Sequence, residues 1–247
     1  MSPHTLFDHG RLPLICVPLV AKTRANLLAD AAAVVPQRPD VIEWRVDHFA
    51  DIESPDLVVA AGSALREITG DIPLIFTLRS SAEGGHPLSL SPQAMEALRL
   101  AAADQLPFEF HDVEMRSPDS LTSELIRRVH AHGGRVILSA HDFQGTPNDE
   151  ELASVFLRAY QLGGDVAKVA VMPQSPEDVL RLLAMTRRMS ETLPIPVVSM
   201  SMGSLGVMSR IFGGVFGSAL TFATSAGESA PGQLPIKDLR EILSRVV

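Results

Sequence analysis

A lysine in the middle of an apolar run is the residue with the clearest potential for chemistry. Lys168 lies within Val-Ala-Lys-Val-Ala-Val, residues 166–171, where its ammonium group cannot be solvated in the usual way. Burial and nearby arginines would favour the neutral amine, which attacks a carbonyl carbon to form an imine. The alternative is a structural lysine that is buried as an ion pair with Glu43 or Glu114.

A histidine at the end of the preceding apolar run is the second candidate. His141 follows residues 135–140 and is itself followed by Asp142. An unperturbed imidazole titrates near ~6.5, so His141 could accept and return a proton at neutral pH. An inert, hydrogen-bonded core histidine is the alternative. The nearby candidate nucleophile favours a general acid and base.

Further ionisable residues lie near the ends of other apolar runs. They are Glu43, Arg45 and Asp47 in one run, Arg79 after the next, and Asp112 and Glu114 in a third. Because alternate side chains of a strand share a face, each group would point in one direction. Isolated buried charges are costly, so these residues must compensate one another. They predict either a binding site or a structural network of ion pairs.

Two segments of small residues predict an anion site and a mobile lid. Residues 202–206 are Met-Gly-Ser-Leu-Gly, and Ser209 and Arg210 follow shortly afterwards. Small residues let backbone N–H groups approach a ligand, and Arg210 could hold a carboxylate in a bidentate fork. Residues 224–233 are mostly small and polar, with Gly and Pro, which is typical of a lid or of a plain surface loop.

These candidates are distributed over eight short apolar runs that alternate with amphipathic stretches. The predicted strands are residues 14–20, 41–46, 74–78, 108–114, 135–140, 166–171, 197–200 and 219–223. Eight β/α units in 247 residues predict an α/β fold, a (β/α)8 TIM barrel that forms one domain over residues 1–247. A doubly wound open sheet is the alternative, although residues 21–23 lack its Gly-rich phosphate fingerprint. The ionisable residues would then meet at the catalytic, C-terminal face of the barrel.

The predicted helices have recurrent start and stop signals. Ser-Pro pairs at residues 54–55, 91–92, 117–118 and 175–176 predict a serine cap followed by a proline at the first helical position. Gly133 and Gly163 follow helical stretches where a left-handed residue is expected. Residues 1–12 could form a short N-terminal hairpin or arm.

The composition excludes several classes of protein. A net charge of −8 gives no general attraction for nucleic acid or for anionic membranes. The apolar stretch at residues 12–20 is too short to span a membrane and does not resemble a signal peptide. The single cysteine excludes an internal disulfide and any multi-cysteine metal cluster, which suits a reducing cytoplasm.

Seven motifs, in this order and spacing, resemble those of the type I 3-dehydroquinate dehydratases, which are (β/α)8 enzymes of the shikimate pathway. The resemblance extends from about residue 14 to residue 237. The motifs are Glu43–Asp47, Arg79 with Glu83-Gly84-Gly85, Asp112-Val113-Glu114, Ser139–Phe143, Asp165–Lys168, Met202–Arg210 and Ser229–Gln233. Ala140 departs from the pattern, which has an aromatic residue before the histidine, and this could alter the packing behind His141.

The resemblance implies a role for each residue. Lys168 would form the imine and His141 would move the protons, while Glu114 would orient or charge His141 and Glu83 would be a second acid near the reacting end. The implied substrate ligands are Glu43, Arg45, Arg79, Arg210, Ser229 and Gln233, with Arg210 facing the carboxylate of 3-dehydroquinate. No metal or organic cofactor is implied, because the lysine is itself the electron sink. The family pattern also implies a homodimer.

Three other functions stay open at this point. A class I aldolase would also use an imine, with residues 203–206 as a phosphate site. A metal-dependent barrel could use Glu43, Asp47, Asp112 and His141, although Arg45 and Lys168 would repel the ion. A degenerate barrel that binds a carboxylate metabolite without turnover is the non-enzymatic alternative.

Overall fold

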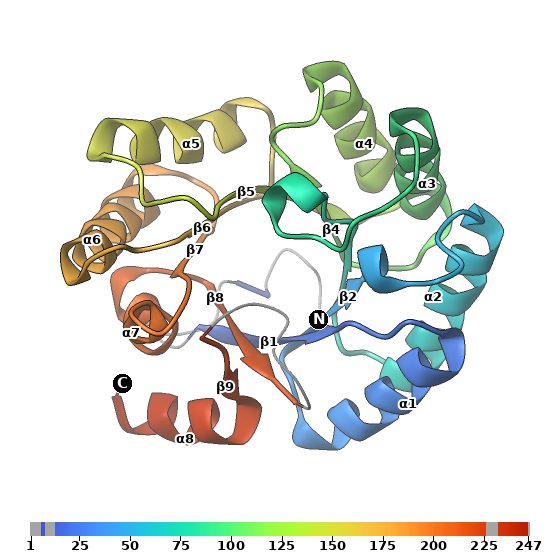
Figure 1. Cartoon of the computed structure of the whole chain (residues 1–247), viewed down its shortest axis with the longest axis horizontal. Helices are drawn as coiled ribbons and strands as arrows, with labels where there is room; N and C mark the ends of the chain where they lie inside the picture. Colours follow the sequence, from blue (N-terminus) through green and yellow to red (C-terminus); the bar gives the residue numbers. More distant parts are fainter. Residues whose placement is uncertain (1–5, 8–12, 226–231, 247) are drawn as a thin grey trace.

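The computed structural model describes residues 6–7, 13–225 and 232–246, which form a ring of parallel strands surrounded by helices (Figure 1). The strands of the ring are β1 (Leu14–Leu19), β2 (Val41–Arg45), β3 (Leu74–Thr77), β4 (Phe110–Glu114), β5 (Arg135–Asp142), β6 (Val166–Val171), β7 (Val197–Ser201) and β8 (Leu220–Thr224). They pair in sequence order from β1 to β7, and β8 pairs with β1. A parallel bridge between Val197 and Ser218 joins β7 to the start of β8 and closes the ring. The predicted (β/α)8 barrel is confirmed, and the open sheet is wrong.

The helices cover the outside of this ring. They are α1 (Arg24–Val34), α2 (Pro55–Thr69), α3 (Pro92–Gln105), α4 (Asp119–Ala131), α5 (Asp149–Gln161), α6 (Pro176–Thr192), α7 (Val207–Phe212) and α8 (Ile236–Val246). Short 3-10 helices lie at Val35–Gln37, Val46–His48, Ser81–Glu83 and Gly213–Phe216. Within the described ranges, no helix is long and apolar enough to cross a bilayer.

All eight predicted strands are present, with bounds that agree within two residues. The difference that matters for the site is at β5, which continues to Asp142, so His141 lies inside the strand and not after it. A two-residue strand, β9 (Leu234–Pro235), adds to β8 and was not predicted. A segment this short carries no alternation of apolar and polar residues from which it could be recognised.

The start signals of the helices are confirmed in part. Pro55, Pro92 and Pro176 each occupy the first position of a helix. Among the serines that precede them, Ser91 makes the expected side-chain bond, accepting from the N–H of Ala94 at 3.1 Å, and Ser54 and Ser175 make none of this kind.

The prediction for the fourth Ser-Pro pair, residues 117–118, is wrong. Pro118 is itself the cap residue and α4 begins at Asp119. Gly133 and Gly163 are confirmed in the left-handed region, with φ of 78° and 88°.

The barrel interior changes from apolar to charged along its axis. The apolar half contains Leu6, Cys16, Val41, Ile75, Phe110, Ile137, Val166, Val198 and Leu220, all buried. The ring of Phe7 meets that of Phe110 edge-on at 5.5 Å. Most of the predicted N-terminal hairpin or arm, residues 1–5 and 8–12, lies outside the described residues. The inward residues further along the strands are ionisable, so the sequence concentrates its charges at the C-terminal ends.

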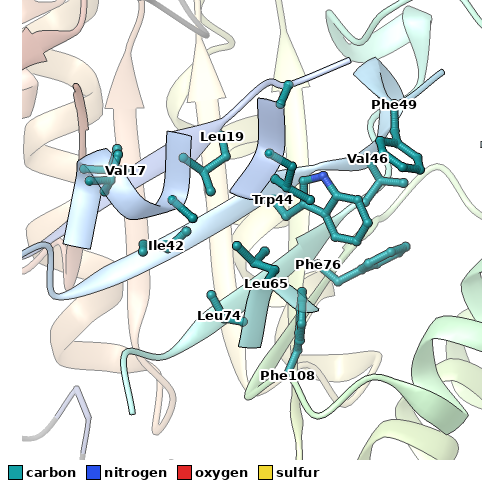
Figure 2. Close-up of a cluster of buried hydrophobic side chains, with 14 of the residues drawn as sticks. Val17, Leu19, Ile42, Trp44, Val46, Phe49, Leu65, Leu74, Phe76 and Phe108 are labelled. Carbon is teal, nitrogen blue, oxygen red and sulfur yellow. The ribbon is translucent and has the colours of Figure 1, made fainter. Parts of the chain in front are cut away.

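Trp44 anchors the strand that carries two of these charges. Its ring packs edge-on against Phe49 at 5.5 Å and against Phe76 at 6.4 Å, in the apolar layer between strands and helices (Figure 2). Since alternate side chains of a strand face opposite sides, Glu43 and Arg45 are directed into the barrel. The packing of the outer layer therefore fixes the orientation of the inner charges.

The outer layer also contains a buried histidine that makes a prediction about stability. His111 on β4 is 4% exposed, and burial lowers its pKa to about 4. As the pH falls, His111 is protonated first in the unfolded chain, so its protonation favours unfolding. The free energy of unfolding is therefore at its full value above pH ~6.5 and decreases as the pH falls toward the folded pKa of His111. Between pH 7 and pH 5, we expect the parent protein to lose about 2 kcal/mol more unfolding free energy than a His111→Leu variant, which lacks this titrating group.

Urea unfolding at the two pH values measures this difference. The exposed His132 provides the control, because a His132→Gln variant should keep the pH dependence of the parent protein. Equal pH dependence of the His111→Leu variant and the parent would show that His111 is not buried in its neutral form.

Candidate active site

The charged end of the barrel contains a cavity that collects most of the predicted site residues. Its lining consists of Glu43, Arg45, Arg79, Glu83, Gly84, His141, Phe143, Lys168, Ala170, Met200, Met202, Arg210, Phe222 and Gln233. Glu114 lies behind this lining, in contact with Arg79. Ser229 and most of the predicted lid lie outside the described residues. The structure thus brings residues from five strands, from the loops after β3, β5 and β7, from α7 and from the segment before β9 to one place.

Lys168 is buried among anions and an aromatic ring. Its Nζ lies 2.9 Å from Oδ2 of Asp112 and 3.7 Å from Oε1 of Glu43, and 4.8 Å from the centre of the Phe222 ring. The Glu43 carboxylate is held in turn by the hydroxyl of Thr77, at 2.8 Å. Of the partners expected for a structural lysine, Glu43 is therefore present, but Asp112 is the nearer anion.

Asp112 is a permanent anion in this arrangement. Burial would raise the pKa of its carboxyl, but Arg79 and Lys168 outweigh burial and hold the pKa well below its usual range. Its Oδ1 accepts from Arg79 and from Ser139, both at 2.7 Å. A fixed negative charge beside Nζ holds the lysine side chain in one place.

His141 is oriented by Glu83. Its Nδ1 lies 2.8 Å from Oε2 of Glu83, so that Nε2 is the ring nitrogen left for a ligand. The prediction that Glu114 orients His141 is therefore wrong. The side chain of Glu114 is occupied elsewhere, because its Oε1 accepts from the backbone of Ser80 at 2.7 Å and lies 3.2 Å from Arg79.

The loop after β3 explains how Glu83 reaches this position. Ser81–Glu83 forms a 3-10 turn, and Gly84 leaves it in the left-handed region with φ of 80°. A Cβ on Gly84 would lie 2.2 Å from the ring of Phe143, so only glycine fits here. The Glu-Gly pair of the motif is thus a carboxylate on a tight turn.

The electrostatic environment favours a neutral imidazole at His141. Burial lowers its pKa well below 6.5, and the positive charges of Arg79 and Lys168 lower it further. Burial and the negative charge of Glu114 raise the pKa of Glu83 to about 7. With Glu83 ionised, Nδ1–H donates to it and Nε2 carries the free lone pair of a general base.

Arg79 holds the acidic residues together. Its guanidinium donates to Asp112, Glu114 and Ser139, at 2.7, 3.2 and 2.9 Å, and lies 3.5 Å from Glu83. Burial would lower its pKa, but these carboxylates raise it above its ordinary value. Arg79 lines the cavity as predicted, but its contacts are those of a residue that positions other side chains.

Arg45 and Asp47 form a separate buried pair. Both nitrogens of the Arg45 fork donate to the carboxylate of Asp47 at 2.8 Å. Asp47 lies in the 3-10 turn after β2, and it also accepts from the backbone N–H of His86 at 2.9 Å. Because Asp47 fixes Arg45 from behind, the side chain of Arg45 lines the cavity in a defined position.

Arg210 approaches the cavity from α7, as predicted. It is 1% exposed, and its Nη1 lies 3.8 Å from the sulfur of Met200. The turn before α7 is tight: a Cβ on Gly206 would lie 2.1 Å from the carbonyl oxygen of Ser201. Ser209 ties the helix to β7, since its hydroxyl accepts from the N–H of Ser201 at 2.8 Å. The small residues of this segment thus allow a buried cation at the cavity wall.

Some residues of the site were not predicted as site residues. Asp112, Phe143 and Met202 belong to the sequence motifs without a predicted role in the site, and Met200 and Phe222 are predicted only as strand residues. The alternation along the eighth strand could have placed Phe222 inward, next to Lys168.

The site combines a buried amine, a neutral imidazole and a cationic wall at the C-terminal mouth of a (β/α)8 barrel, which is the position of the active site in barrel enzymes. Comparison with known proteins agrees. Residues 15–246 match the family model for type I 3-dehydroquinase. A 3-dehydroquinate dehydratase of Albidiferax ferrireducens is 48% identical over 234 residues, which cover 95% of this chain and 89% of that protein.

Solved structures extend the comparison to the fold. The 3-dehydroquinate dehydratase of Geobacillus kaustophilus is similar with a TM-score of 0.92 and 40% identity, over 95% of this chain and 91% of that one. The type I 3-dehydroquinate dehydratase of Clostridium difficile, crystallised with covalently modified comenic acid, gives 0.91 and 38%, over 95% and 92%. The chain belongs to the type I 3-dehydroquinase family.

Proposed function

We propose that this chain converts 3-dehydroquinate into 3-dehydroshikimate and water, through an imine on Lys168. The observation that carries the proposal is the burial of Lys168 between Asp112 and Glu43, in the cavity that His141 also lines. Membership of the family and the names of the similar proteins support the choice of substrate. The reaction is one step of the shikimate pathway.

The first stage is the formation of the imine. The neutral amine of Lys168 adds to the C3 ketone, and the carbinolamine loses its hydroxyl as water. His141 carries the protons, because its neutral Nε2 can accept a proton and return it. The anions beside Nζ would stabilise the positive charge of the protonated imine.

The second stage is the elimination. The protonated imine withdraws electrons, so the proton on C2 becomes acidic enough for His141 to remove. The resulting enamine expels the C1 hydroxyl as water, with a proton from His141, and hydrolysis of the conjugated imine releases the product and Lys168. Lys168 is itself the electron sink, so this scheme uses no metal or organic cofactor.

The remaining residues would hold the substrate ring. Arg210 would bind the carboxylate and Glu43 and Arg45 would bind hydroxyl groups, while Gln233 and Ser229 stay predicted ligands. Their contribution is orientation, which keeps the C2–H bond aligned with the imine. The single domain over residues 1–247, the homodimer and the cytoplasmic location also stay predictions.

The assay follows from the chemistry of the product, which contains a conjugated enone. Purified protein mixed with 3-dehydroquinate should develop the ultraviolet absorbance of this enone, with and without EDTA. A class I aldolase would instead cleave sugar phosphates, and a barrel that only binds carboxylates would give no turnover. Failure to turn over 3-dehydroquinate, with an intact fold, would contradict the proposal.

A further inference from the structure

A second cavity lies behind His141, on the outer side of the strands. It has a volume of about 530 Å³ and shares Glu83 and His141 with the substrate cavity. Ala140 is part of its wall, and so are the apolar side chains of Leu152 and Val155. The small residue that departs from the family pattern thus lines open space behind His141. The Glu83–His141 pair therefore forms part of the wall between the two cavities.

An exposed arginine reaches Glu83 from the second cavity. Nε of Arg116 lies 3.9 Å from Oε1 of Glu83, and the side chain of Arg116 is 69% exposed. The other oxygen of the same carboxylate, Oε2, contacts His141 at 2.8 Å. One carboxylate therefore joins a solvent-exposed cation to the imidazole of the site.

The backbone holds Arg116 in this place. It lies in the turn between β4 and α4, where the N–H of Met115 donates to the carbonyl of Ser139 at 2.9 Å. The N–H of Ser117 donates to the carbonyl of Glu114 at 3.0 Å. Both anchors are on strands of the site, so the turn is fixed relative to Glu83.

We propose that Arg116 is a positioning residue that acts from the outer cavity to keep Glu83 ionised against His141. The inference rests on the proposed dehydratase activity only in its kinetic consequence. The ionised carboxylate accepts Nδ1–H of His141 and leaves Nε2 free to take the substrate proton. A protonated Glu83 performs this function less well, because a neutral carboxyl is a weaker acceptor than a carboxylate.

Other charged groups also act on Glu83. They are Arg79, 3.5 Å away at the end of β3; Asp112 and Glu114 on β4; His141 on β5; and Arg99 on α3. Burial and Glu114 raise the pKa of Glu83 to about 7, while Arg79 and Arg116 oppose them. Near neutral pH a small change in this balance alters the ionised fraction of Glu83 strongly.

Loss of the Arg116 charge should shift the pH dependence of activity in one direction. Activity is highest with ionised Glu83, so it is greatest above the pKa of this carboxyl and decreases as the pH falls through it. Removal of Arg116 takes away a positive charge and raises this pKa, by about half a unit for a solvent-exposed partner at this distance. The acid limb of the kcat profile would move to higher pH by the same amount.

The experiment compares kcat over the pH range for the parent and three variants, with 3-dehydroquinate as substrate. We expect Arg116→Gln to lose about twofold at pH 7 and about threefold at lower pH, and to equal the parent at alkaline pH. Arg116→Lys should restore the parent profile, and Arg116→Glu should shift it further. A uniform loss at all pH values, or an unchanged limb, would overturn the proposal.

Arg158 supplies the matched control, because it is also an exposed arginine on the wall of the outer cavity, paired with Asp119. Arg158→Gln should leave the acid limb in place. A second measurement needs no substrate: NMR titration of the His141 ring nitrogens reports the protonation of Glu83. In Arg116→Gln this titration should move by the same half unit, and an unmoved titration would overturn the proposal even if 3-dehydroquinate were not the substrate.

Discussion

Borohydride added to this protein together with 3-dehydroquinate is expected to attach the substrate skeleton to Lys168 and to abolish activity irreversibly. Reduction converts the imine into a stable secondary amine, so each trapped molecule loses its nucleophile. Borohydride without substrate should leave the protein active. Mass spectrometry of proteolytic peptides measures the position of the adduct.

The sequence makes this assignment unambiguous, because the chain contains three lysines: Lys22, Lys168 and Lys237. Lys22 and Lys237 are exposed and can be replaced with arginine as matched controls. Both control variants should be trapped as efficiently as the parent. An adduct on either of these lysines would contradict an imine in the barrel.

Substitution of Lys168 tests the same point independently. Lys168→Arg keeps a positive charge near Asp112 and Glu43 but cannot form an imine, so we expect kcat to fall by at least on the order of 10⁴-fold. Lys168→Met removes the charge as well. It takes one cationic partner away from two buried carboxylates, which keep Arg79, Ser139 and Thr77, at a cost of up to roughly 3–5 kcal/mol of unfolding free energy. A folded Lys168→Arg variant with substantial activity would exclude the imine mechanism.

The sequence predicts the position of Lys168 better than its surroundings. The apolar run of residues 166–171 identifies a buried strand, and the period of two places Lys168 on one face. Its nearest anion, Asp112, lies two strands away, and that contact depends on how far each side chain extends across the barrel. Spacing along a chain contains no such information, so Glu43 and Glu114 were equally reasonable partners.

Which of Glu83 and Glu114 contacts His141 could not be predicted from the sequence either. Glu83 follows β3 and Glu114 is the last residue of β4, and both could reach His141 from the sequence alone. The turn at Ser81–Glu83 brings Glu83 against Nδ1, and the N–H of Ser80 holds Glu114 away from it. Loop geometry decides between them. Strands are predicted well because hydrophobic burial repeats along the chain, whereas loop contacts are specified by few residues at close range.

Replacement of His141 is the second change for which we expect a very large effect. His141→Ala removes the group that moves each proton of the proposed scheme, and loss of a general acid and base costs about 10²–10⁴-fold in rate. Because the carboxylates beside Lys168 come from β2 and β4, its position does not depend on His141. The variant should therefore still bind substrate, and kcat should fall far more than the affinity.

The two variants together separate the two stages of the reaction. His141→Ala with substrate and borohydride should give the adduct on Lys168 more slowly than the parent, because His141 also carries protons during imine formation, whereas Lys168→Arg gives none. Glu83→Gln is the matched control, because an amide oxygen can still accept Nδ1–H but cannot ionise. It should keep more activity than His141→Ala and lose the acid limb near pH 7, where burial and Glu114 place the pKa of Glu83.

A His141→Ala variant within tenfold of the parent would show that another group moves the proton from C2. The geometry leaves few substitutes, because His141 lines the cavity beside Lys168 and its pKa is lowered by burial, which keeps a neutral base at physiological pH.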